Sequence, residues 1–301
     1  MVHWDEAPAR RRFHDDIAAT WIDLGRAAGS VDVGVQLIRI EPGKRSTPAH
    51  VHGAEEEIFY VLSGSGLLWQ SGKTCRVAPG DCIVHLPVRG THTLRAGADG
   101  MEVLAFGTRV LLELCYLPRA EHSWAGPTVL PSPPPQDLFP LDDAVPFPFP
   151  EPGERPPNVV AGGDVEPMVD HGRERRDLGT AAGSRRTGIK HITVEPGRLA
   201  CVPHCHSADA EVFVVLEGDG TLELGDERLA VRPGSAVARP PGTGVAHAFR
   251  AGEGGLTLLA YGTRQPNDIC FYPRSGKIAF WGVGVIGRLE QLDYWEGEEE
   301  S

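Results

Sequence analysis

The sequence is poor in basic residues and has no long apolar run. Its 29 Lys and Arg stand against 41 Asp and Glu, a formal net charge of −12, so the overall field repels phosphate backbones and anionic membrane surfaces. No stretch reaches the roughly 18 apolar residues expected of a membrane-spanning helix, and the first residues lack the apolar centre of a secretory signal. We therefore expect no nucleic-acid partner, no membrane partner and a cytoplasmic location.

Cysteine is also scarce, with six residues in the chain. Their positions have neither the density of a disulfide scaffold nor the paired C-x-x-C of a structural zinc site, so buried thiols are expected. Cys205 lies between two histidines, and because strand side chains alternate between faces, it should point away from any ion that those histidines bind. The six cysteines are Cys75, Cys82, Cys115, Cys201, Cys205 and Cys270.

Glycine and proline, by contrast, are abundant, with 37 and 26 residues. Short apolar runs such as IFYVLSG, CIVHLP and VFVVLEG alternate with glycine-bearing turns. This is the pattern of short strands joined by tight turns, and no stretch shows a sustained helical stripe. An all-β protein built from antiparallel sandwiches or barrels is predicted.

The chain repeats itself. DLGRAAGS begins at Asp23 and DLGTAAGS begins at Asp177, an offset of 154 residues, and HVH at 50–52 matches HCH at 204–206 at the same offset. Farther on, FGTR and YGTR match at 155, which indicates one inserted residue. The two halves should therefore share one fold.

A proline-rich segment separates the halves, because 12 of the 26 prolines lie between Pro127 and Pro157. Proline interrupts regular strands and helices, so this segment is interpreted as a linker, or as an extended strap that covers its Phe139, Phe147 and Phe149 against the barrels. The predicted domains are residues 1–126 and 161–301, joined by the linker at 127–160.

Both halves contain an H-x-H pair followed five residues later by a glutamate and, farther along, by a third histidine. Two histidines at i and i+2 of a strand project from one face, so both imidazoles can reach one ion. A buried cluster of imidazoles and a carboxylate would be costly without a cation. The predicted metal ligands are His50, His52, Glu57 and His92 in the first half and His204, His206, Glu211 and His247 in the second.

These residues resemble the two motifs of the cupin superfamily, approximately G-x5-H-x-H-x(3,4)-E-x6-G and G-x5-P-x-G-x2-H-x3-N. The first motif fits from H-x-H to Gly64 and to Gly218, and this spacing selects Glu57 among three adjacent glutamates. The second is looser, since both halves lack its asparagine, six residues instead of five separate its glycine from its proline, and the gap from Gly90 to His92 is one residue short. In the first motif, six residues instead of five separate the glycine from H-x-H. The resemblance implies two tandem jelly-roll (double-stranded β-helix) barrels, a bicupin.

The resemblance also implies a divalent metal ion in each barrel, which could be Fe, Mn, Zn, Ni or Cu. With this ligand set we expect a metal-dependent enzyme, dioxygenase-like, that acts on a small oxygenated or anionic metabolite. A non-catalytic small-molecule-binding or regulatory cupin is the alternative, and a metal-dependent decarboxylase, isomerase or lyase is a further one. The chain could be a monomer or a homo-oligomer.

Several other residues invite interpretation. Glu55 and Glu56 are expected to be surface charges, and His85 to be structural or pocket-lining, with Arg239 as its counterpart. Lys190 and His191 precede the second H-x-H and are interpreted as solvated surface residues. The first pocket is approached by Glu55, Glu56 and His85, and the second by Arg239, Cys201 and, if it faces inward, Lys190. We therefore expect an anionic substrate to fit the second barrel better.

Overall fold

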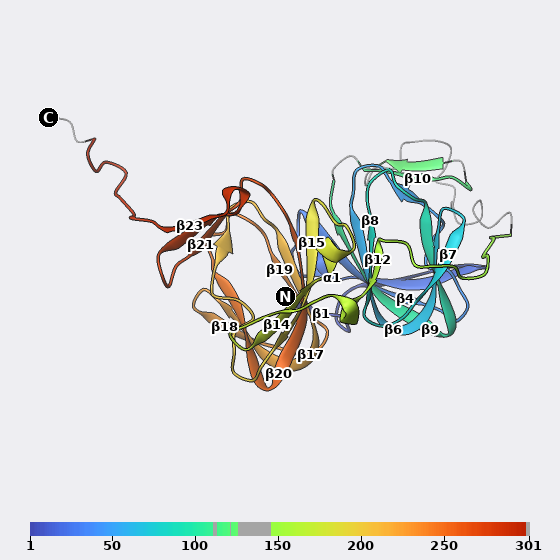
Figure 1. Cartoon of the computed structure of the whole chain (residues 1–301), viewed down its shortest axis with the longest axis horizontal. Helices are drawn as coiled ribbons and strands as arrows, with labels where there is room; N and C mark the ends of the chain where they lie inside the picture. Colours follow the sequence, from blue (N-terminus) through green and yellow to red (C-terminus); the bar gives the residue numbers. More distant parts are fainter. Residues whose placement is uncertain (111–112, 121, 126–145, 299–301) are drawn as a thin grey trace.

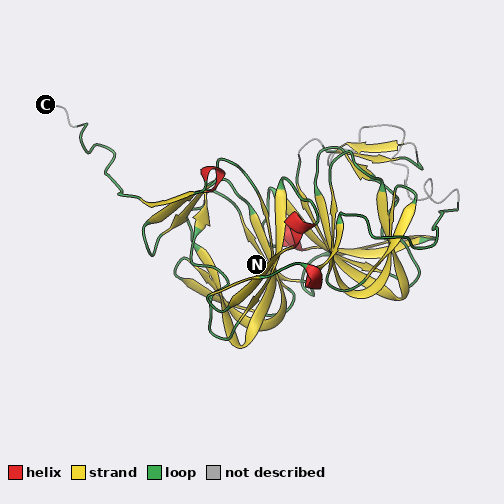
Figure 2. Ribbon diagram, in the orientation of Figure 1, coloured by secondary structure: helices red, strands yellow, loops and turns green. Residues whose placement is uncertain are grey.

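The chain forms two β-barrels that lie side by side in a computed structural model, which describes residues 1–110, 113–120, 122–125 and 146–298 (Figure 1). Almost every regular element is a strand, and the helices are single turns (Figure 2). The predicted all-β fold with two jelly-roll barrels is confirmed. Among the helices of the described residues, none has the length and apolar character needed to cross a membrane.

The first barrel is built on one antiparallel sheet with the strand order β12-β8-β6-β9-β4-β3-β2, and β7 pairs with β6. Successive side chains of a strand point to opposite faces of the sheet, and this alternation decides which of them fill the interior of the barrel. Phe59 and Val61 point into the barrel, while Ile58 and Tyr60 point toward the neighbouring barrel. The strands are β2 (Ala9–His14), β3 (Ile17–Asp23), β4 (Val33–Ile40), β6 (Glu57–Gln70), β7 (Lys73–Val77), β8 (Asp81–His85), β9 (His92–Thr108) and β12 (Val159–Ala161).

The second barrel repeats this plan in the order β1-β19-β17-β20-β15-β14-β13, with β18 on β17. Its interior is filled by apolar side chains such as Phe213, Val215 and Phe249. The strands are β1 (Val2–His3), β13 (Met168–Asp170), β14 (Arg173–Asp177), β15 (Thr187–Val194), β17 (Glu211–Leu224), β18 (Glu227–Val231), β19 (Ser235–Arg239) and β20 (His247–Thr263).

Each barrel carries a small sheet that includes the second histidine of its H-x-H pair. In the first barrel the order is β11-β10-β5, and in the second it is β16-β21-β22-β23. These strands are β5 (Val51–His52), β10 (Leu114–Leu117), β11 (His122–Ala125), β16 (Cys205–His206), β21 (Ile269–Tyr272), β22 (Lys277–Phe280) and β23 (Val285–Arg288). The short helices are α1 (Leu24–Ala27), α3 (Leu178–Ala181), η1 (Gly162–Asp164) and η2 (Trp281–Val283).

The glycines that close the first motif sit where strands approach most closely. Gly64 and Gly218 have φ values of +71° and +74°, and a Cβ at either position would lie 2.2 Å from a backbone carbonyl oxygen of the neighbouring strand. No side chain fits there, which is why glycine stands at this point of both halves.

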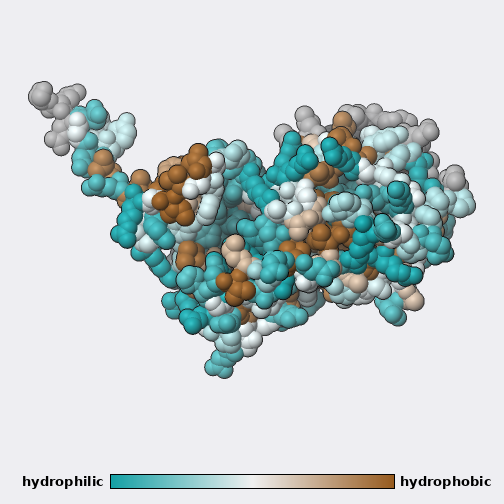
Figure 3. All heavy atoms as spheres, in the orientation of Figure 1, coloured by the Kyte–Doolittle hydropathy of each residue, from teal (hydrophilic) through white to brown (hydrophobic). Residues whose placement is uncertain are grey.

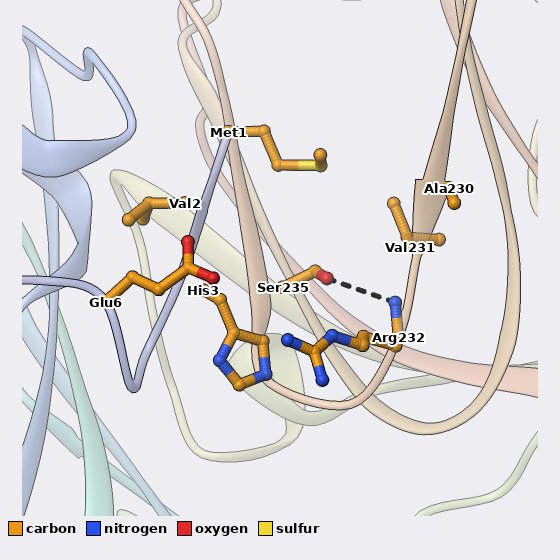
Figure 4. Close-up of a pocket in the computed structure, with 8 residues that line it drawn as sticks. All are labelled: Met1, Val2, His3, Glu6, Ala230, Val231, Arg232 and Ser235. Carbon is orange, nitrogen blue, oxygen red and sulfur yellow. Dashed lines mark hydrogen bonds between the residues drawn. The ribbon is translucent and has the colours of Figure 1, made fainter.

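The barrels exchange edge strands. β1, at the start of the chain, pairs with β19 of the second barrel, and β12, which leads into the second half, pairs with β8 of the first. Figure 4 shows this N-terminal segment beside Ser235, with Val2 and His3 lining a pocket against it. His3 Nε2 lies 2.9 Å from the carbonyl oxygen of Pro233. Each barrel therefore depends on residues from the other half of the sequence.

The described part of the linker, from residue 146, packs on the first barrel as the strap hypothesis predicts. The Phe147 ring lies 4.8 Å from the Trp69 ring, and the Arg155 guanidinium donates hydrogen bonds of 2.8 and 2.6 Å to the two carboxylate oxygens of Asp81. Phe139 lies outside the described residues.

A shared apolar core joins the barrels. It contains Leu104 and Phe106 from β9 together with Leu259 and Tyr261 from β20, all buried. Burial of this kind is worth roughly 25 cal/mol per Å² of apolar surface, so the two barrels hold each other in place. On the outer surface, hydrophobic side chains gather where β21–β23 lie (Figure 3), including Trp281, Val283 and Ile286.

Candidate metal centres

The first candidate centre lies at one end of the first barrel, where three separate stretches meet. His50 and His52 flank the start of β5, Glu57 begins β6, and His92 begins β9. Backbone hydrogen bonds in both directions between His50 and His92, of 3.1 and 2.9 Å, fasten these stretches together. The sheet thus brings residues far apart in sequence to one point.

The three imidazoles converge on the carboxylate of Glu57. Its Oε2 atom lies 2.9 Å from His92 Nε2, 3.6 Å from His52 Nε2 and 3.9 Å from His50 Nε2. Ligand atoms of all four residues lie within 4.8 Å of one another. This spacing is compatible with one ion about 2.1 Å from each atom.

Backbone carbonyls orient two of these imidazoles. His50 Nδ1 lies 2.9 Å from the oxygen of Pro48, and His92 Nδ1 lies 3.1 Å from the oxygen of Gly90. With Nδ1 donating to a carbonyl, the Nε2 lone pair of each ring is free for a cation.

The second barrel has a similar arrangement, but among the described residues its four predicted ligands do not form a single group: His206 belongs to separate groups with Cys270 and with Asp268. Glu211 Oε2 lies 3.1 Å from His247 Nε2 and 3.5 Å from His206 Nε2, and His204 forms a close group with Glu211 and His247. His204 Nδ1 lies 2.7 Å from the oxygen of Val202, the counterpart of the contact that orients His50.

Several buried polar atoms in these clusters have no hydrogen-bond partner among the described residues, which indicates that a bound group completes each site. His52 Nε2, His247 Nε2 and Glu211 Oε2 are buried and have no hydrogen bond, which is costly unless another group satisfies them. Burial, helped by neighbouring histidines, lowers the pKa of His50 to about 3 and that of His204 to about 4. Although burial lowers the pKa of His52, the nearby carboxylate of Glu57 raises it to about 9, so a bound cation would displace a proton there. Imidazoles and an ionised carboxylate are the donor set of a divalent ion, so the residues fit one.

A further carboxylate supports each centre, and sequence reasoning missed both. Asp268 Oδ2 lies 2.6 Å from Nδ1 of His206, and Glu113 Oε1 lies 3.3 Å from Nδ1 of His52. Backbone N–H groups hold both carboxylates: Ala208 and Asp209 donate to Asp268, and Gly53, Ala54 and Glu55 donate to Glu113.

A carboxylate behind a ligand histidine fixes its tautomer and makes it a better donor. The sequence could have indicated these two carboxylates. ELCY, which begins at Glu113, and DICF, which begins at Asp268, follow FGTR and YGTR and keep the same offset of 155 residues. Glu113 and Asp268 are therefore duplicated positions.

Cysteines differ in their relation to the second centre. Cys270 is buried and its sulfur lies within 4.8 Å of ligand atoms of both His204 and His206. Cys205 belongs to none of the possible metal-binding groups of the described residues, and its thiol instead approaches the carbonyl oxygen of Phe271 at 3.9 Å. The outward orientation expected for Cys205 is confirmed.

His85 lines the first centre. Its ring stacks on His92 with centroids 3.6 Å apart and planes 4° from parallel, and both of its nitrogens are buried without a hydrogen bond. Burial holds the pKa of His85 well below its usual value. His85 therefore packs against a candidate ligand of the first centre, in agreement with the structural alternative of its interpretation.

Three surface interpretations are wrong. Glu56 is 1% exposed, because alternation turns it away from Glu57 and into the second barrel. Lys190 shares a face with the buried Ile192 and points into the second barrel. The His191 ring stacks against Tyr60 of the first barrel at 6.3 Å. In each case the alternation along the strand could be read from the sequence. The packing that buries the side chain could not.

Comparisons with known proteins agree with this architecture. The cupin domain family matches residues 36–106 and again residues 190–260, while no curated protein matches the chain. Oxalate decarboxylase from Bacillus subtilis, studied for its Mn(II) centres, has a TM-score of 0.60 at 16% identity, over 89% of this chain and 78% of its own.

Two further solved structures are similar to the chain. Oxalate decarboxylase from Lactobacillus farciminis, in a formate complex, has a TM-score of 0.59 at 15% identity, over 89% of this chain and 87% of its own. A sugar phosphate isomerase from Silicibacter pomeroyi is 25% identical over 42% of this chain and 89% of its own, with a TM-score of 0.38. At these identities the decarboxylases show the shared two-barrel fold.

Proposed function

Because the chain belongs to the cupin superfamily and contains two cupin domains in tandem, we propose that it is a metal-dependent enzyme acting on a small oxygenated or anionic metabolite, with one divalent ion in each barrel. The observation that carries the proposal is the convergence of three imidazoles and one carboxylate from separate strands, with ligand atoms within 4.8 Å of one another in the first barrel. A purely structural cluster would not leave such groups unpaired.

The chain's residues define what the site can do. Three imidazoles bound as neutral ligands, with one carboxylate, would leave a divalent ion with a net charge of +1, and an octahedral ion would keep two positions for ligands. An ion held there would polarise a substrate oxygen or, if redox-active, activate O2. Asp268 holds His206 in the tautomer that binding requires, through the hydrogen bond at Nδ1. Glu113 lies at the matching place in the first barrel, 3.3 Å from Nδ1 of His52.

The reaction class follows from the metal and the second substrate. A dioxygenase-like reaction is the first candidate, because a substrate enolate or carboxylate can share the ion with O2. A decarboxylase is the second, favoured by the fold similarity to the two oxalate decarboxylases. The same ligand set occurs with both chemistries, so the fold by itself does not choose.

Elemental analysis of the natively purified protein, with turnover assays on small carboxylates with and without O2, tests the proposal. We expect two equivalents of metal per chain and turnover that disappears with chelation. Iron or copper with O2 consumption supports the dioxygenase, and manganese with CO2 release supports the decarboxylase. Metal binding without turnover of any compound would leave a binding protein and contradict the proposal.

We also propose a cytoplasmic location. All six cysteines are free thiols, and five of them are buried. Free thiols are typical of a reducing compartment. Fractionation of the native cells tests this location.

A further inference from the structure

The two barrels differ at two matched positions beside their metal-binding residues. In the first barrel, Gly34, Gly107, Glu57 and His85 are successive partners across neighbouring strands. The matching row of the second barrel is Gly188, Gly262, Glu211 and Arg239. Directly paired residues project from the same face of a sheet. An imidazole in one barrel is therefore replaced by a guanidinium in the other.

The next row inward shows a second difference. Gln36, Ala105, Phe59 and Ile83 are partners in the first barrel, and Lys190, Ala260, Phe213 and Val237 in the second. Phe213 and Val237 belong to the buried interior of the second barrel, so Lys190 points into the same interior. The Lys190 ammonium has no hydrogen bond or ion pair with the described residues.

The acidic groups near these positions match between the barrels, so the two cations remain a difference between them. The second lining carries a lysine and an arginine where the first has Gln36 and His85. The matched acidic pairs are Asp23 with Asp177, Glu55 with Asp209, Glu57 with Glu211, and Glu113 with Asp268.

Arg239 is held in place yet keeps unused donors. Its Nη2 donates hydrogen bonds of 2.7 Å to the carbonyl oxygen of Val245 and 3.2 Å to Thr243 Oγ1, in the loop before His247. Its Nε is buried and has no partner. A guanidinium remains charged and its fork matches a carboxylate, so an anion in the barrel would satisfy the group that the protein leaves unpaired.

We propose that the second barrel is the one that takes an anionic substrate, a small dicarboxylate or comparable dianion held between the metal ion and the side chains of Arg239 and Lys190. This inference rests on the proposed function, because it assumes an ion on His204, His206, Glu211 and His247. The first barrel has Gln36 and His85 at these positions in place of a lysine and an arginine, and binds such anions weakly.

Malonate binding to the metal-loaded protein, measured by calorimetry, tests this inference. We expect one malonate per chain. The double variant with Lys190→Gln and Arg239→His, which gives the second barrel the lining of the first, should lose at least about tenfold in affinity while keeping both metal equivalents. The matched control Gln36→Ala should bind malonate within about twofold of the wild type.

A second double variant, Lys190→Arg with Arg239→Lys, keeps both charges and separates charge from packing. It should retain most of the malonate affinity that the variant Lys190→Gln with Arg239→His loses. An unchanged malonate affinity in Lys190→Gln with Arg239→His would overturn the inference. An equal loss in the control Gln36→Ala, or in the variant Lys190→Arg with Arg239→Lys, would also overturn it. Turnover is measured separately. Malonate binding by a protein that turns over no compound would contradict the proposed function alone. Turnover with an unchanged KM in the variant Lys190→Gln with Arg239→His would contradict this inference alone.

Discussion

Glu56 of the first barrel accepts a hydrogen bond of 2.6 Å from the hydroxyl of Ser184 in the second, although its neighbour Glu57 faces the first metal centre. The same carboxylate accepts from the backbone N–H of Arg185 at 2.9 Å and of Thr187 at 3.1 Å, and from the Thr187 hydroxyl. Although burial would raise the pKa of Glu56, these hydrogen bonds lower it. The turn of one barrel is thus fastened beside a metal ligand of the other.

Replacing Glu56 by Ala should destabilise the protein by about 2–4 kcal/mol, because it leaves several buried donors of the 184–187 turn without an acceptor. Chemical denaturation measures the loss. The control is Glu253→Gln, an exposed carboxylate at a strand bend, which should change stability by less than about 0.5 kcal/mol. Equal stabilities of the two variants would show that the contact across the barrels contributes nothing.

Asp268→Asn should weaken metal binding in the second barrel by about 10- to 100-fold, because His206 loses the carboxylate that orients its ring. Glu113→Gln should do the same in the first barrel. Competition with a chelator followed by metal analysis would show one weakened equivalent in each variant. Asp226→Asn, in an exposed turn, is the matched control. If Asp268→Asn weakened both equivalents alike, the assignment of each carboxylate to its own centre would be wrong.

Stability should fall as the pH drops below about 6.5, with His191 contributing. Burial, and next the charge of Arg176, lower the pKa of His191 in the folded protein, so the unfolded chain binds this proton at higher pH. The contribution of His191 to the free energy of unfolding is therefore complete above the pKa of the unfolded chain. It is lost as the pH falls below that pKa toward the pKa of the folded protein, by at most about 1.4 kcal/mol per pH unit. Denaturation curves between pH 5 and 7.5 measure the slope.

The variant His191→Gln should flatten this slope, since its side chain does not titrate in that range. The control is His171→Asn at an exposed turn, which should keep the wild-type slope. A slope that is unchanged in His191→Gln would assign the pH dependence to other groups.

Removing the first six residues should destabilise the protein by about 2 kcal/mol or more, since this exposes the edge of β19 and removes Trp4, which packs against the shared core. Removing the chain from Glu290 onward is the comparison, because residues 290–298 are exposed. Thermal unfolding of the two truncated proteins measures the difference. A larger loss on truncating the C-terminal end would contradict the role given to β1.

Local pattern was enough to predict the repeat, the strands and the residues that converge in the two candidate metal centres. His50 and His52 had to share a face because strand side chains alternate. The 154-residue offset predicted the same arrangement for His204 and His206. The closing glycines were equally readable, since Gly64 and Gly218 stand where no side chain fits.

Only the tertiary structure decided what lies across each face. Alternation places Glu56 opposite to Glu57, but whether that face meets water or Ser184 depends on how the barrels dock. The exchange of β1 and β12 likewise joins strands from different halves of the chain. Sequence periodicity records the direction in which a side chain points. The partner it meets depends on long-range packing, which brings together residues with no regular spacing along the chain.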